Sequence, residues 1–108
     1  MVFKSLFIAH APDADMEKHR CVIETPSLYK LFVSVVRNQQ QAVSVAKNLL
    51  ENEGIHSILL CPGFTHADVA EIQEAVKGRA GVCVARGDSP STRITRAVME
   101  EAGWFKKT

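Results

Sequence analysis

The sequence contains no long hydrophobic run and no block of like charge, and each absence excludes a class of protein. No apolar stretch approaches the roughly 20 residues that a membrane-spanning helix needs. Thirteen basic and twelve acidic side chains give a formal net charge of +1, and no cluster of like charge exceeds Lys106-Lys107. Nucleic-acid binding surfaces are strongly basic. We therefore expect neither a membrane nor a nucleic acid as a partner.

Cysteine is also scarce, and its spacing excludes a disulfide framework. The three cysteines, Cys21, Cys61 and Cys83, are an odd number without a C-x-x-C pair. Four clustered ligands for a structural zinc are not apparent either, so we expect no metal and no cofactor. The start Met1-Val2-Phe3-Lys4 enters a strand pattern directly, without the features of a signal peptide. Together these observations predict a cytoplasmic protein.

What the sequence does contain is an alternation of strand and helix patterns over one domain, residues 1–108. Apolar residues at both parities indicate strands that are covered on both faces. Alternating strands and helices favour a mainly parallel sheet built from right-handed crossovers. We therefore predict an α/β fold, a small three-layer flavodoxin- or Rossmann-like sandwich with helices on both faces and a four-stranded sheet in the order 2-1-3-4. The expected strands are 2–9, 28–36, 55–61 and 81–85, and the expected helices are 39–53, 67–77 and one from Ser89 or Ser91 to about 102.

The segment 13–25 fits two structures. Asp13 or Asp15 is placed to cap a short helix that continues to Arg20. The residues that follow, 21–25, instead have the β-branched character of a strand. Both structures remain open at this stage.

Residues 57–68 are the most informative stretch, because they predict a buried strand, a tight turn and a helix start in succession. Pro62-Gly63 ends the strand. Thr65 fits an N-cap, and Asp68 completes a capping box with it. The free amides and positive dipole of a helix start attract phosphate or carboxylate. The alternative is that Thr65 only caps the helix and that His66 is a solvated residue of its first turn.

The carboxyl ends of parallel strands meet at one edge of a sheet, where ligands bind. The candidate ligand-binding residues at this edge are Gly63, Phe64, Thr65, His66 and Arg86. The candidate catalytic residues are His10, Cys61, His66 and Asp88. Each has a simpler explanation, such as core packing for Cys61 or a surface ion pair between Arg86 and Asp88. A nucleophilic pair of Cys61 with His10 or His66 would need a lowered thiol pKa and hydrogen-bond contact.

The C-terminal segment combines an amphipathic helix with two large aromatic residues. The expected apolar stripe of the helix consists of Ile94, Ala97, Val98 and Ala102. Trp104 and Phe105 follow it and must be buried somewhere. They pack either on their own domain or in a subunit interface, where such aromatics are enriched. A homo-oligomer formed through Trp104 and Phe105 is therefore one expectation.

Several short motifs resemble a known family. They are E-K-H-R at 17–20, I-E-T-P at 23–26, L-C-P-G-F at 60–64 and V-A-R-G-D at 84–88. The chain resembles an uncharacterised family of small α/β proteins, a domain of unknown function of roughly 100 residues. That resemblance implies one domain and supplies no catalytic residues.

The residues themselves favour a small anionic metabolite bound at the carboxyl edge of the sheet. The alternative is a non-enzymatic oligomeric or partner-binding module, and whether the protein is an enzyme stays open.

Overall fold

The computed structural model describes residues 1–106. This part of the chain forms five strands and three helices, with three strands in succession before the first helix. The strands are β1 (Phe3–His10), β2 (Arg20–Glu24), β3 (Tyr29–Val36), β4 (Ser57–Leu60) and β5 (Gly81–Val84). The helices are α1 (Gln39–Glu53), α2 (His66–Val76) and α3 (Ser89–Glu101). None of these helices is long and apolar enough to cross a membrane.

The strands form one mixed sheet in the order β2-β3-β1-β4-β5. Strands β3, β1, β4 and β5 are parallel, and β2 is an antiparallel edge strand beside β3. The predicted α/β class and the predicted order of the four parallel strands are confirmed. The prediction of only four strands is wrong, because the sheet has a fifth.

The additional strand comes from the segment that the sequence left open. Asp15 accepts backbone hydrogen bonds from Lys18 and His19, and its carboxylate accepts one from Glu17 N. This makes a single turn and not the alternative short helix. The chain then enters β2, because Val22 and Ile23 pair with Phe32 and Leu31 of β3.

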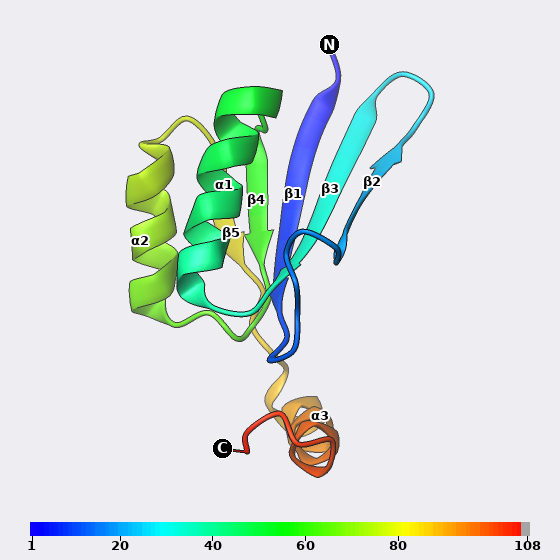
Figure 1. Ribbon diagram of the computed structural model, residues 1–108, viewed down its shortest axis with the longest axis vertical. Coiled ribbons are helices and arrows are strands. Elements are labelled where there is room, and N and C mark those ends of the chain that lie inside the picture. The colour runs from blue at the N-terminus through cyan, green and yellow to red at the C-terminus, as the bar shows by residue number, and fades with distance from the viewer. Residues whose placement is uncertain (107–108) are drawn as a thin grey trace.

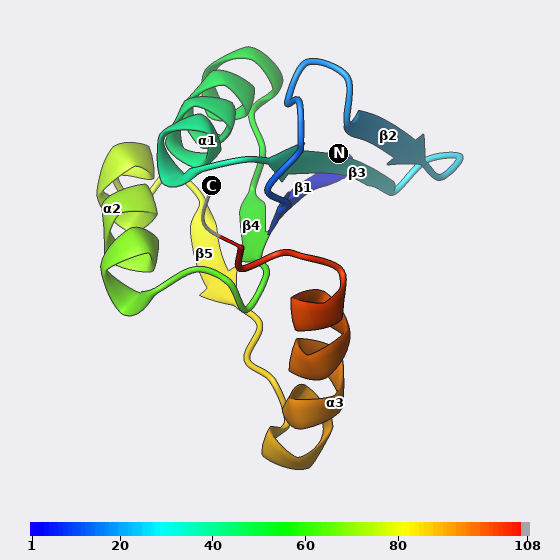
Figure 2. The same cartoon turned by 60° about the horizontal axis from the view of Figure 1, so that its bottom comes forward.

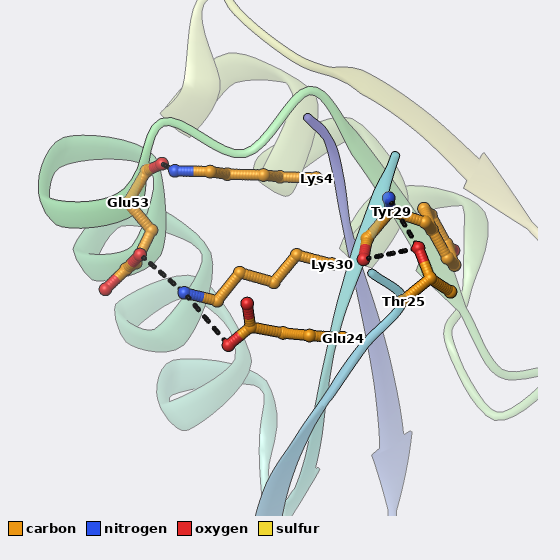
Figure 3. A network of polar contacts seen from close by, with 6 residues as sticks. All are labelled: Lys4, Glu24, Thr25, Tyr29, Lys30 and Glu53. Carbon is orange, nitrogen blue, oxygen red and sulfur yellow. Dashed lines mark hydrogen bonds and ion pairs between the residues drawn. The ribbon is translucent and has the colours of Figure 1, made fainter. Parts of the chain in front are cut away.

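Polar contacts fix the β2–β3 hairpin at the end of the sheet opposite to the carboxyl ends of the parallel strands (Figure 3). Thr25 Oγ1 accepts a hydrogen bond of 2.9 Å from Tyr29 N and closes the turn. Lys30 Nζ lies 3.9 Å from Glu24 Oε1 and 3.7 Å from Glu53 Oε1, while Lys4 Nζ donates to Glu53 O. These contacts connect the hairpin and β1 to the end of α1.

Helices α1 and α2 cover the same face of the sheet (Figures 1 and 2). Their connections run in one direction, from β3 to β4 and from β4 to β5, and right-handed crossovers that run in one direction lie on one side. The core is therefore a single layer between these helices and the sheet. It includes Leu6, Ile8, Ile58, Leu60 and Phe64, which are all fully buried.

Within residues 1–106 the other face has no helix, so the predicted three-layer sandwich with helices on both faces is wrong. Strand residues expected to be covered are exposed there: Phe3 by 49% and Leu59 by 43%. Cys83 is also exposed. Apolar residues at both odd and even positions correctly indicated strands. In the described chain, however, a protein layer covers only one face of these strands.

Helix α3 lies beyond the carboxyl ends of the strands and away from the sheet faces (Figure 1). Asp88, and not Ser89 or Ser91, is its N-cap residue. None of its residues is buried, so the burial predicted for the stripe Ile94, Ala97, Val98 and Ala102 is wrong within the described chain.

Candidate functional site

A cleft of about 760 Å³ opens where the carboxyl ends of β1 and β4 face α3. Small-molecule sites usually have volumes of about 300–1,000 Å³. We call this space the C-terminal cleft. It is lined by Ala9, His10, Ala11, Pro12, Arg37, Cys61, Pro62, Gly63, Gly87, Asp88, Ser91, Thr92, Thr95, Arg96, Met99, Trp104 and Phe105.

His10 ends β1 and contributes a neutral imidazole to the cleft. Its ring stacks on Phe64, with 4.0 Å between the centroids and 24° between the planes. Partial burial lowers the pKa of His10 below its ordinary value, and the nearby carboxylate of Asp68 opposes this effect. A neutral imidazole carries one N–H donor and one acceptor nitrogen. His10 can therefore donate to a ligand oxygen or accept a ligand proton.

Gly63 allows the imidazole of His10 and the thiol of Cys61 to come close together. A Cβ at position 63 would lie 3.2 Å from His10 Nδ1 and 3.5 Å from Cys61 Sγ. A side chain here would therefore push the imidazole aside, and the φ of Gly63 is not in the left-handed region. No hydrogen bond joins the thiol to the imidazole in the described chain. The two groups border the same space without forming a nucleophile–base pair.

Arg86 does not line the cleft, but it holds the loop that borders it. Its Nη1 donates to the carbonyl oxygens of Pro62 at 3.2 Å and Phe64 at 2.8 Å. These bonds connect the end of β5 to the loop that follows β4. The side chain is occupied by the loop, and no ion pair joins Arg86 to Asp88 within residues 1–106.

The other residues predicted at the helix start have local roles. Thr65 Oγ1 accepts a hydrogen bond from Asp68 N, and Asp68 Oδ2 accepts one from Thr65 N. This confirms the predicted capping box. Phe64 is fully buried behind His10, and His66 is an exposed first-turn residue. Of the predicted ligand-binding residues, only Gly63 lines the cleft, whereas His10, Cys61 and Asp88 of the predicted catalytic group line it together.

The wall formed by α3 was not anticipated. Ser91, Thr92, Thr95, Arg96 and Met99 all line the cleft. Their spacing of i, i+1, i+4, i+5 and i+8 places them on one face of a helix. The hydroxyl-rich face of the C-terminal helix was a signal that could have identified them.

Arg37 and Arg96 provide the positive charge of the cleft. Arg96 Nε lies 3.1 Å from Glu100 Oε1, and its guanidinium lies over the ring of Phe105, 4.8 Å from the centroid. The side chain of Arg37 makes no hydrogen bond or ion pair with the described residues. Asp88 is the one acidic side chain among the lining residues. Since His10 is mainly neutral, the cleft carries a small excess of positive charge.

No set of three or more His, Cys, Asp or Glu residues in the described range 1–106 is placed to hold a metal ion. A second hollow, of about 400 Å³, lies between α1 and the β2–β3 hairpin. None of the predicted site residues lines it. The C-terminal cleft is therefore the stronger candidate.

These features define a small α/β protein with a ligand-sized cleft at the carboxyl edge of a mixed sheet. The chain belongs to a family of unknown function, DUF6506, whose family model matches residues 3–100. This confirms the resemblance to an uncharacterised family. We found no match among curated proteins and none among solved structures.

Proposed function

We propose that the C-terminal cleft binds a small anionic metabolite with an apolar body. The observation that carries the proposal is Arg37. This exposed residue lines a largely apolar space, and its side chain has no ionic partner in the described chain. A carboxylate or phosphate matches the planar donor set of arginine.

The apolar part of the ligand would contact side chains from both sides of the cleft. Trp104, Phe105 and Met99 border it on the α3 side, and Pro12 and Pro62 border it on the sheet side. Aromatic side chains supply large contact areas for planar apolar groups. Phenyl phosphate should therefore bind better than inorganic phosphate.

His10 would recognise the polar part of the ligand. As a neutral imidazole beside Gly63, it supplies one donor and one acceptor without adding charge. Serine and threonine hydroxyls from α3 face the same space. This combination of one free cation, a neutral imidazole and hydroxyls suits a singly or doubly charged acid.

The experiment is a thermal-shift titration of the purified protein with phenyl phosphate, inorganic phosphate and a set of carboxylates. A ligand at 100 times its dissociation constant adds roughly 2.7 kcal/mol to the free energy of unfolding. Arg37→Gln should abolish most of the shift. Arg79→Gln is the matched control, because Arg79 lies on the surface outside the cleft and pairs with Glu51 at 2.7 Å.

A shift that survives Arg37→Gln, or one that Arg79→Gln abolishes equally, would refute a site at the cleft. The earlier candidate His66 gives a second control. Its exposed position outside the cleft means that His66→Ala should leave the shift unchanged.

A further inference from the structure

The sheet face opposite α1 and α2 has the character of an interface. Successive side chains of a strand point to opposite faces of the sheet, and residues paired across neighbouring strands point to the same face. The positions in register on this face are 3, 5, 7 and 9 in β1, 29, 31, 33 and 35 in β3, 57 and 59 in β4, 81 and 83 in β5, and 21 and 23 in β2. We call these positions the open sheet face.

None of these fourteen positions holds a charged residue. The opposite parity of the same strands includes Lys4, Arg20 and Lys30. Three residues spread across the open sheet face are strongly exposed: Phe3 by 49%, Ile23 by 56% and Leu59 by 43%. A large apolar patch without charge is unusual on a monomer and marks an interaction surface.

The second unpartnered surface is on α3. Ile94 is 68% exposed and Val98 is 61% exposed. They lie one helical turn apart, and Ala97 and Ala102 extend the same stripe. None of these residues lines the C-terminal cleft. The helix therefore lines the cleft with its hydroxyl-rich side, and its apolar stripe lies outside the cleft lining.

We propose that the open sheet face binds the α3 apolar stripe of a second copy of this chain, in a reciprocal exchange. Each chain carries one apolar sheet face and one apolar helix stripe, which are the two halves of a common α/β interface. In a dimer with two-fold symmetry, the open sheet face and the α3 stripe of each copy are both covered, and the assembly is closed. The second copy then supplies the third layer that a single chain lacks.

The helix and the sheet face match in size. A 13-residue helix is about 20 Å long and about 10 Å wide. Five strands spaced about 4.8 Å apart form a platform about 19 Å across. A standard stable interface buries roughly 1,200–2,000 Å², which the two symmetry-related contacts would divide among four surfaces of about 300–500 Å² each.

A second copy fits better than the chain's own helix. In its own chain, α3 forms one wall of the cleft. Met99 in the last turns of α3, and Trp104 and Phe105 after the helix, border this cleft. Folding α3 onto its own sheet face would open this wall. Exchange between two copies keeps the cleft and covers both apolar surfaces.

The test begins with the molar mass of the purified full chain by size-exclusion chromatography with light scattering. We expect a dimer of 11.9 kDa chains. Ile94→Asp/Val98→Asp should give monomers, and so should Leu59→Asp on the open sheet face. Arg93→Asp is the matched control in α3, since Arg93 is exposed and lies outside both the stripe and the cleft lining; it should remain dimeric. Circular dichroism of each variant must show the native helix content.

A mixing experiment identifies which surfaces meet. A tagged Ile94→Asp/Val98→Asp chain retains an intact sheet face, and an untagged Leu59→Asp chain retains an intact helix. If helix binds sheet, the two form a heterodimer through one intact contact, and the tagged chain retains the untagged one. Failure of retention would overturn the helix-on-sheet exchange, because sheet-to-sheet or helix-to-helix pairing gives no intact contact in this mixture. A wild-type chain that is monomeric at 100 µM (a concentration on the order of common micromolar affinities) would overturn the proposal directly.

Ligand binding is a separate readout. The monomeric variants change residues outside the cleft lining, so loss of the dimer and loss of phenyl phosphate binding are distinguishable results.

Discussion

The imidazole of His10 stacks on the ring of Phe64 with 4.0 Å between the two centroids. This contact joins the end of β1 to the loop after β4, and it places a neutral imidazole at the mouth of the cleft. The stack explains both the partial burial of His10 and its lowered pKa. Phe64, which the sequence suggested as a ligand-binding residue, is fully buried behind this imidazole.

The first prediction concerns pH. The folded state lowers the pKa of His10 through burial, so the unfolded chain binds more protons between the folded value and the ordinary value of about 6.5. The contribution of His10 to stability is therefore complete above pH 6.5 and decreases as the pH falls below it. Urea unfolding of the wild type and of His10→Gln between pH 5 and 8 measures this. The wild type should lose more stability on acidification; equal slopes would contradict the pKa direction.

The second prediction concerns Gly63. Gly63→Ala puts a methyl group 3.2 Å from His10 Nδ1, so the imidazole must move. Because the backbone angle there suits alanine, the loss of stability should be under about 1 kcal/mol. The shift produced by phenyl phosphate should fall several-fold. Unchanged ligand binding would show that His10 can move without effect on the site.

The third prediction concerns Gly87, where the hydroxyl of Thr92 occupies the space of a Cβ. Gly87→Ala should therefore displace the start of α3 and reduce stability by about 1–3 kcal/mol, the usual cost of overpacking. Adding Thr92→Ala removes the clashing hydroxyl. Urea unfolding should show that the double variant recovers most of the loss, and a simple sum of the two single effects would contradict the proposed clash.

The fourth prediction separates Arg86 from the ligand site. Arg86→Gln removes two hydrogen bonds to the loop carbonyls, which should cost about 1 kcal/mol of stability for an exposed group. His66→Ala should change stability by less than about 0.5 kcal/mol. Equal effects in denaturant titrations would mean that Arg86 does not hold the loop.

Local signals in the sequence were sufficient for several elements. Helix α1 begins after Asn38 and ends before Gly54, which are the bounds 39–53 that the sequence predicted. The box of Thr65 with Asp68 was also predictable, because capping chemistry acts within one helical turn. The order of the four parallel strands agrees with the flavodoxin-like order predicted from the alternation of strands and helices.

The sequence did not predict how many layers the protein has. An apolar strand residue such as Leu59 has the same pattern whether a helix of its own chain covers it, a partner covers it or nothing does. The same ambiguity applies to Ile94, whose helical spacing indicates an apolar stripe without naming its partner. The placement of Trp104 and Phe105 at the cleft likewise depends on where α3 turns after β5.

The role of Arg37 was only partly predictable. Arg37 directly follows the expected strand 28–36, which puts it at the carboxyl edge of the sheet. That its side chain has no ionic partner among the described residues depends on the three-dimensional arrangement. Arg86 was the stronger candidate by position, yet it is occupied by two backbone carbonyls.

The central claim is that the C-terminal cleft is the ligand site, and its most direct test is a nuclear magnetic resonance titration. Phenyl phosphate added to ¹⁵N-labelled protein should shift the amide signals of Ala9, Gly63 and Thr95, which line the cleft on three segments. Signals from the outer side of α2, such as Glu74, should remain in place. If Arg37→Gln also removes the shifts, the account holds. Shifts confined to residues outside the cleft, or none at millimolar concentration (about −4 kcal/mol of binding), would contradict it.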